Sequence, residues 1–290
     1  MKKLLIVVIC VGLILSAAGC KSPEKPAQIV ATTLPVYHFT TTLCKGSHIT
    51  VSRLITDQVS CLHDYSLQTR QMRAIEGAEL IVISGGGLEA FLDAELTRGR
   101  KWIDASSGIQ LHCGDLHAHD EHHHHDADPH YWLSPVLSKQ MVENICAGLV
   151  AEYPEHKALF TENKLQLLQQ LDQLQSYGEI TLQELSCRKL ITFHDGFSYF
   201  AESFGLEIIK AVEGEVGSEA SAAELIEIIK LVQTQNLPAI FTERSGSTSA
   251  ASIIGAETGA KQFYLDMAMS GDNYFDAMQH NIDTIKEALG

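Results

Sequence analysis

The chain has few positive charges for its size. Its 290 residues include 21 Lys and Arg against 36 Asp and Glu, and the formal net charge is −15. Surfaces that bind nucleic acid are usually basic because they must neutralise phosphates, so this balance argues against a nucleic-acid partner. An acidic surface is compatible with attracting cations, although many soluble proteins share it.

Several motifs of catalysis, redox chemistry and nucleotide binding are missing. None of the seven cysteines forms a CxxC pair, which excludes zinc-ribbon and thioredoxin-like motifs, and no HExxH occurs. The glycines at 85–87 lack the spacing of a GxGxxG fingerprint and the Gly-Lys-Ser/Thr ending of a P-loop. They predict a tight turn between a strand and a helix, not a phosphate-binding loop.

No apolar run is long enough to span a bilayer as a helix, which takes ~20 residues. The N-terminal run Leu4–Leu15 follows Lys2 and Lys3 and precedes Ser16–Cys20, and this order predicts a secretory signal peptide over 1–19. The small residues before Cys20 resemble a bacterial lipobox, which implies lipidation of Cys20 and a polar tether over 20–28. We therefore expect a membrane-anchored lipoprotein outside the bacterial cytoplasm; an ordinary signal peptide with an incidental cysteine is the alternative.

Five cysteines remain besides Cys10 and Cys20, an odd number that allows at most two disulfides. The pattern does not fix their pairing, and an oxygen-poor habitat would leave all five reduced. The pair to test first is Cys61 with Cys113, because these two flank the motifs described below. The five cysteines are Cys44, Cys61, Cys113, Cys146 and Cys187.

Apolar, β-branched runs alternate with helical patterns, which is typical of βαβ units and a mostly parallel sheet. Each half of the chain holds four such runs, so we expect an α/β fold of two lobes, each a parallel sheet flanked by helices. The predicted strands are 28–32, 49–54, 80–84, 101–104, 189–193, 207–210, 239–242 and 262–265. The predicted helices are 34–44, 66–76, 88–97, 197–204, 220–235, 247–258 and 274–289.

A segment almost free of glycine and proline lies between the halves. It predicts one long rigid helix over 154–185, which joins an N-terminal lobe over 29–153 to a C-terminal lobe over 186–290. A surface helix of the first lobe alone is the alternative. The apolar positions that recur at helical spacing are Leu159, Phe160, Leu165, Leu168, Leu171 and Leu174.

A histidine-rich stretch is the most informative feature of the chain. Eight of the 14 histidines fall within 112–132, interleaved with carboxylates. Imidazole is a common ligand of Zn²⁺ and other transition ions, and a stretch with so few apolar residues predicts a mobile loop over 112–128. We interpret this loop as an accessory metal-binding segment. Its candidate ligands are His117, His119, His122, His123, His124 and His125.

Four further residues lie at strand ends or in loops, two in each half. His63 and His130 belong to the first half, and His194 and Asp266 directly follow apolar runs in the second. Ligands of α/β proteins gather outside the carboxyl ends of the strands, so two facing lobes would bring these groups into one cleft. Taken singly, each histidine is better explained as a hydrogen-bonded structural residue, and the aspartate as a helix cap.

Taken together, these motifs resemble the solute-binding proteins of zinc and manganese ABC transporters. The resemblance extends over nearly all of the mature chain, 29–289. It rests on His63-Asp64-Tyr65, on 78–82 with 85–89, on Asp-Pro-His-Tyr-Trp-Leu-Ser-Pro at 128–135, on Phe-His-Asp-Gly-Phe-Ser-Tyr-Phe at 193–200, on 240–243 and on Tyr264-Leu265-Asp266 with the terminal helix. It implies a receptor that works with a separate membrane permease and ATPase and has no catalytic activity of its own. We expect a monomer.

The resemblance implies a metal site formed by His63, His130, His194 and Asp266. Three imidazoles and one carboxylate suit four-coordinate Zn²⁺, and Mn²⁺ leans towards oxygen donors. In the family, manganese-binding members often have a carboxylate at the position of His194, and a histidine-rich loop is typical of zinc-binding members. Glu243 and Asp195 are the candidate hydrogen-bond partners of the ligands. Capping of the next helix is the alternative role for Asp195.

The chain departs from the family pattern in two places. Cys61-Leu62 precedes the first ligand where the family usually has Asp-Pro, which makes Cys61 a further candidate donor. Met267-Ala268 follows Asp266 where Pro-Leu is common, so water or Glu243 could substitute for this ligand.

The leading hypothesis is a high-affinity zinc-binding protein that delivers Zn²⁺ to an ABC importer. A manganese or iron receptor of the same class is the first alternative. A secreted zinc hydrolase is the second, although a fourth protein ligand would close the position that a catalytic zinc keeps open for water. A zinc-storing adhesin displayed by its lipid anchor is the third.

Overall fold

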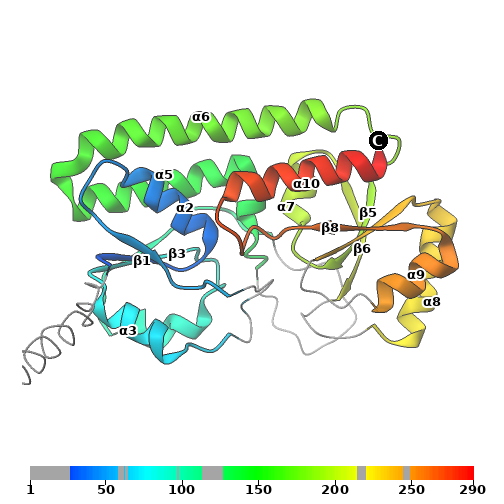
Figure 1. The fold of residues 1–290 in the computed structure, drawn as a ribbon, viewed down its shortest axis with the longest axis horizontal. Helices are drawn as coiled ribbons and strands as arrows, with labels where there is room; N and C mark the ends of the chain where they lie inside the picture. Colours follow the sequence, from blue (N-terminus) through cyan, green and yellow to red (C-terminus); the bar gives the residue numbers. More distant parts are fainter. Residues whose placement is uncertain are drawn as a thin grey trace, which may run out of the picture.

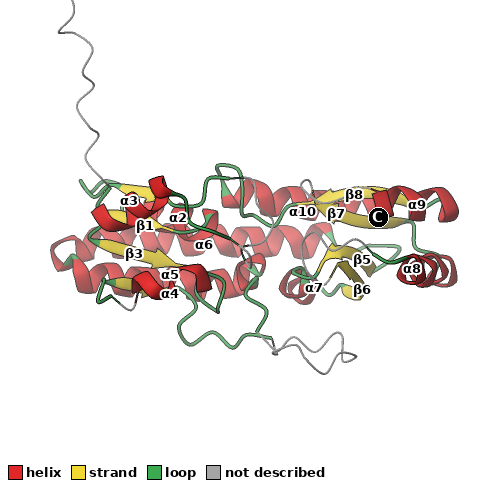
Figure 2. Ribbon diagram, turned by 90° about the horizontal axis from the view of Figure 1, so that it is seen from below, coloured by secondary structure: helices red, strands yellow, loops and turns green. Residues whose placement is uncertain are grey.

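The computed structural model describes residues 27–57, 62, 65–96, 98–112, 127–213, 220–243 and 249–290. The predicted signal peptide 1–19 and Cys20 lie outside these ranges. The described chain forms two four-stranded parallel sheets that lie at opposite ends of an elongated molecule, each flanked by helices (Figures 1 and 2). Within the described ranges, no helix combines the length and the apolarity that a membrane span requires.

The first sheet has the strand order β2-β1-β3-β4. All residues of β1 and β3 are buried, as expected for central strands of a parallel sheet that is covered on both faces. The strands are β1 (Ile29–Ala31), β2 (Val51–Arg53), β3 (Leu80–Ile83) and β4 (Trp102–Asp104). The helices are α2 (Leu34–Leu43), α3 (Thr69–Gly77), α4 (Asp93–Leu96) with the 3₁₀ turn η1 (Ala90–Leu92) before it, and α5 (Pro135–Glu152).

The second sheet has the order β6-β5-β7-β8 and is also parallel. The predicted strands are all present, with ends shifted by up to three residues. The strands are β5 (Lys189–His194), β6 (Glu207–Glu213), β7 (Ala239–Glu243) and β8 (Lys261–Leu265). The helices are α7 (Ser198–Ser203), α8 (Ala222–Gln235), α9 (Ser249–Thr258) and α10 (Tyr274–Leu289).

One long helix joins the halves. After the 3₁₀ turn η3 (Pro154–His156), α6 (Lys157–Thr181) continues for 25 residues along the length of the molecule (Figure 1). It packs against α2 and α5 of the first half and α10 of the second, so it is not a surface helix of the first lobe alone. The domain bounds themselves stay a prediction.

The buried face of α6 differs from the predicted stripe at three positions. Leu165 is 62% exposed, and Leu159 and Leu168 are only partly buried. The buried positions follow the 3.6-residue period of a helix. The buried residues are Phe160, Asn163, Leu167, Leu171, Leu174 and Gly178.

The glycines at 85–87 form the predicted turn after β3. All three have positive φ, and a Cβ on Gly85 would lie 1.9 Å from Asp104 Oδ1. The turn therefore requires glycine at Gly85 for both backbone conformation and space.

Three of the five mature cysteines lie in the described ranges, and each is a free thiol: Cys44 and Cys146 are buried and Cys187 is partly buried. Burial raises the pKa of the Cys44 thiol to about 12. The proposed partners Cys61 and Cys113 lie outside the described residues.

Candidate metal centre

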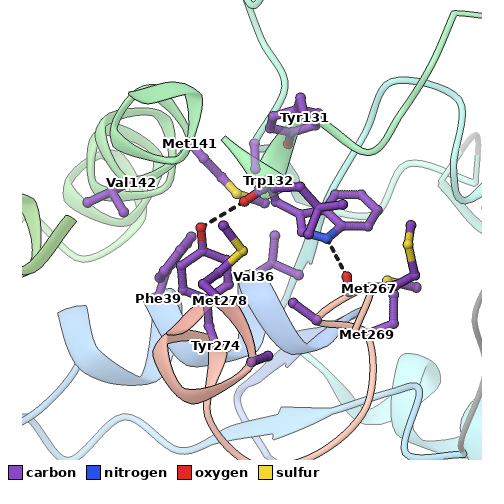
Figure 3. Close-up of a cluster of buried hydrophobic side chains, with 14 of the residues drawn as sticks. Val36, Phe39, Tyr131, Trp132, Met141, Val142, Met267, Met269, Tyr274 and Met278 are labelled. Carbon is purple, nitrogen blue, oxygen red and sulfur yellow. Dashed lines mark hydrogen bonds between the residues drawn. The ribbon is translucent and has the colours of Figure 1, made fainter. Parts of the chain in front are cut away.

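His130 immediately precedes a fully buried 3₁₀ turn, η2 (Tyr131–Leu133). The Tyr131 hydroxyl donates to Ser84 O at the end of β3. The Trp132 indole Nε1–H donates to Met267 O at 2.8 Å, and Trp132 O accepts the Tyr274 hydroxyl at 2.7 Å (Figure 3). Because these bonds tie the turn to both halves, they fix the position of His130 between the sheets.

His194 is the last residue of β5 and its side chain is directed to the same junction. Alternate residues of a strand face opposite sides of the sheet, and Leu190 belongs to the core between the halves whereas Ile191 and Phe193 belong to a separate outer core. His194 is four residues after Leu190 in the same strand and therefore faces the same side of the sheet. A Cβ on Gly196 would lie 2.8 Å from His194 Cδ2, so glycine at this position makes room for the ring.

The structure brings these two predicted ligands together. His130 Nε2 and His194 Nε2 are 3.4 Å apart, with the ring planes at 89° to one another, and the residues are 3% and 6% exposed. Two nitrogens bound at ~2.0–2.1 Å to a tetrahedral Zn²⁺ lie about 3.3–3.4 Å apart, so this spacing fits one shared ion.

Asp128 holds His130 in the orientation that metal binding needs, and the sequence analysis did not single it out. Asp128 Oδ1 accepts from the backbone N–H of His130 at 2.9 Å and lies 2.8 Å from its Nδ1. With the Nδ1 proton on this bond, the lone pair of Nε2 is directed at His194. Burial raises the pKa of Asp128, but the hydrogen bond and charge of His130, together with Ser198, outweigh burial and place this pKa below its ordinary value. The signal in the sequence was the position of Asp128, two residues before a predicted ligand.

Glu243 lies on the same side of the second sheet as His194. It ends β7 and is 6% exposed. It faces the same side of the sheet as Ala239 and Phe241, which belong to the core between the halves. Thr192 pairs with Phe241, so two residues further along each strand His194 and Glu243 reach the carboxyl edge side by side. Its predicted role at the site fits this placement.

Asp195 follows His194 in the turn that leads to α7. The N-cap of α7 is Phe197, so Asp195 does not occupy the capping position that was its alternative role.

Asp266 lies directly after β8, at the same edge. Its backbone N–H donates to Asn281 Oδ1 and its carbonyl accepts from Asn281 Nδ2, both at 2.7 Å. Its Oδ1 accepts from Ala268 N at 2.8 Å, and Ala268 has φ of +54°, a strained conformation for a non-glycine residue. The two residues that depart from the family pattern therefore shape a tight loop around this carboxylate.

His63, Cys61 and the six histidines between 117 and 125 lie outside the described residues. Within the ranges that are described, no group of three or more His, Cys, Asp or Glu side chains has the spacing to hold a metal ion. His130 and His194 thus form the part of the predicted ligand set that the structure brings together.

A buried carboxylate, Glu89, closes the turn after β3 next to the site. Its Oε1 accepts the Thr32 hydroxyl at 2.5 Å and the backbone N–H of Ser84 at 2.7 Å, and its Oε2 accepts from Gly85 N at 2.9 Å. Burial raises the pKa of Glu89 to about 7, although these three donors act in the opposite direction. Because Ser84 O in turn accepts the Tyr131 hydroxyl, this network supports the residue that follows His130.

Residues 29–288 match the family described as zinc-uptake complex component A, periplasmic. The high-affinity zinc uptake system protein ZnuA of Bacillus subtilis is 29% identical, over 98% of this chain and 97% of its own. The zinc-binding lipoprotein AdcA of Streptococcus pneumoniae is 28% identical over 99% of this chain, which spans 61% of the length of AdcA.

Solved structures agree with this assignment. A crystal structure of ZnuA superposes with a TM-score of 0.80 at 29% identity, covering 91% of this chain and 100% of that one. Zn(II)-bound AdcA from Streptococcus pneumoniae superposes with a TM-score of 0.76 at 28% identity, covering 91% of this chain and 57% of that one. The chain belongs to the ZnuA family of metal-binding solute-binding proteins of ABC transporters.

Proposed function

We propose that this protein captures Zn²⁺ outside the cytoplasm and delivers it to the permease of an ABC importer. The observation that carries the proposal is the pair of buried imidazoles from opposite halves, with Nε2 atoms 3.4 Å apart and His130 held by a carboxylate. His63 and Asp266 complete the proposed set of three nitrogens and one oxygen. This set favours Zn²⁺ over Mn²⁺ because Mn²⁺ leans towards oxygen donors. The names of ZnuA and AdcA support the same metal.

The family consists of non-catalytic binding proteins, which leaves the hydrolase alternative without support. The manganese or iron receptor differs from our proposal only in the metal, so a competition experiment separates them.

The test is competition calorimetry with Zn²⁺, Mn²⁺ and Fe²⁺ on the wild type, His194→Ala and His48→Ala. His48 is an exposed histidine in the bend after α2 and serves as the matched control. We expect His194→Ala to weaken zinc binding by more than the roughly 10–100-fold caused by loss of a partner that merely orients a ligand, and His48→Ala to leave it unchanged. Manganese binding as tight as zinc binding in the wild type would overturn the choice of metal.

Deletion of residues 116–127 tests the accessory role of the histidine-rich loop. We expect additional weak zinc binding to disappear and the high-affinity site to survive. Loss of the high-affinity site together with the loop would contradict a site built from His130 and His194.

Mass spectrometry of the membrane fraction tests the anchor. We expect an N-terminal peptide that begins at a lipidated Cys20, and Cys20→Ser should release the protein from the membrane. An unmodified mature N-terminus at another residue would support the ordinary signal peptide instead.

A further inference from the structure

Helix α7 of the second half holds both ends of the histidine-rich segment. His112 and Asp128 flank residues 113–127, and Asp128 N donates to His112 O at 2.9 Å. The Tyr199 hydroxyl lies between them: it accepts from His112 N at 2.8 Å and donates to Asp128 O at 2.7 Å. Its ring stacks on that of His112, with centroids 4.0 Å apart and planes 13° apart. This buried tyrosine therefore fixes the backbone of Asp128 from the opposite half.

Ser198 fixes the Asp128 side chain. Its hydroxyl donates to Asp128 Oδ2 at 2.5 Å, while Asp128 Oδ1 serves the backbone and Nδ1 of His130. One oxygen of this carboxylate is thus held by α7, and the other is bonded to the imidazole of His130. Ser198 and Tyr199 open the helix that follows β5, the strand that ends in His194.

We propose that Ser198 and Tyr199 are positioning residues for the metal ligand His130, acting through Asp128. One continuous segment, from the end of β5 into α7, then supplies His194 directly and sets the orientation of His130 from across the junction. A separation of the two halves would withdraw one ligand and the support of the other in the same movement. The inference rests on the proposed metal site.

The chemical reason lies in the two ring nitrogens of histidine. Nε2 can bind a metal only while the neutral ring keeps its proton on Nδ1, and the bond to Asp128 favours that tautomer. Without the Ser198 hydroxyl, nothing on α7 holds Oδ2, and rotation of the carboxylate turns Oδ1 away from His130.

The test compares Ser198→Ala with Ser203→Ala. Ser203 lies on the same helix and also reaches across the halves, where its hydroxyl donates to Ser134 Oγ at 2.8 Å, so it is a matched control. We expect Ser198→Ala to weaken zinc binding by about tenfold and to speed zinc dissociation, the range known for partners that orient a metal-bound histidine. Ser203→Ala should bind as the wild type does, and Ser198→Thr, which keeps the hydroxyl, should restore the affinity.

A second readout reports on the ring itself. Long-range ¹⁵N–¹H NMR of the metal-free full chain distinguishes Nδ1–H from Nε2–H, and we expect His130 to hold Nδ1–H in the wild type and in Ser203→Ala but a mixture in Ser198→Ala. Tyr199→Phe keeps the stacked ring and loses both hydrogen bonds, so it should weaken zinc binding in the same direction even if Ser198→Ala proves unstable.

The controls separate two failures. If the wild type binds zinc no better than His194→Ala, the proposed function fails and the inference falls with it. If the wild type binds tightly but Ser198→Ala and Tyr199→Phe match Ser203→Ala in affinity and tautomer, only the positioning role is overturned.

Discussion

The two sheets are buried in different ways. Every residue of β1 and β3 belongs to one continuous core, which extends along α5, α6 and α10 into the junction between the halves. The second sheet instead separates two cores: Leu190, Ala239 and Phe241 face the junction, whereas Ile191, Phe193 and Ile240 face a smaller outer cluster under α8 and α9. The candidate ligand His194 thus lies on the strand that separates the core shared by both halves from the outer cluster of the second half.

This difference implies that substitutions in the junction core change both the stability of the protein and metal binding at the proposed site. Substitutions in the outer cluster are expected to change the stability alone. Side chains of the junction core support the fold and the ligands at once. Side chains of the outer cluster support the fold of the second half alone, because the sheet stands between them and the site. Substitutions in the two cores test this contrast.

The largest effect is expected in the junction core. Trp132→Ala removes a fully buried indole and its bond to Met267 O, and we expect the free energy of unfolding to fall by about 4 kcal/mol. Zinc affinity should fall too, because the Trp132 ring packs edge-on against the ring of His130, with centroids 5.3 Å apart. Urea unfolding of the metal-free protein and zinc titration measure the two quantities. A loss of stability with unchanged affinity would contradict the coupling.

In the outer cluster, Ile254→Ala truncates a fully buried side chain of α9 and leaves a cavity. A loss of about 3 kcal/mol in the free energy of unfolding is expected, comparable to other buried Ile→Ala changes. Zinc affinity should stay within about twofold of the wild type, because distant sites with no shared partners behave independently. A marked change in affinity would show that the sheet transmits strain from the outer cluster to the site.

Glu89 makes the first half sensitive to pH. Its pKa is raised to about 7 from 4.5, so the folded state holds the proton more tightly, and this contribution to stability is present below pH 4.5 and lost as pH rises through about 7. The full change is about 3 kcal/mol. Glu89→Gln has no such proton, so the wild type should lose about 3 kcal/mol relative to the variant between pH 4.5 and 7 in urea unfolding. A constant difference across this range would mean that the Glu89 carboxyl is not perturbed.

The smallest effect is expected at the start of α8. Ser221 caps this helix by accepting from Glu224 N, and the Glu224 side chain accepts from Ser221 N in return. Ser221→Ala should cost about 1 kcal/mol, measured as a shift of the urea midpoint. Zinc titration of the same variant should match the wild type, since Ile228 and Val232, the buried residues of α8, belong to the outer cluster. A change in zinc affinity from this distant cap would again argue against two separable regions.

Much of the fold was predictable because its signals are local. Buried parallel strands are continuous apolar runs, and β3 (Leu80–Ile83) and β5 (Lys189–His194) lie close to their predicted bounds. Helix α5 was not predicted, although Ser134 at its N-cap and Pro135 at its first position are both start signals.

The site was predictable only in part. Residues at strand ends, such as His194, follow from the strand pattern together with the resemblance to a family. The role of Asp128 did not follow, because a carboxylate two residues from a ligand has the same local pattern whether it is directed at solvent or at an imidazole. Only the contact with Ser198, 70 residues away in the chain, reveals what holds it.

The α/β class, the alternation of strands and helices and the long joining helix follow from the sequence alone, because each depends on residues close together in the chain. The candidate ligand set follows from motifs that resemble a known family. The tertiary structure decided which residues of the second sheet face the junction, how η2 is tied to both halves, and that the imidazoles of His130 and His194 meet at 3.4 Å. These features depend on packing between segments distant in the chain, where no local pattern specifies the partner.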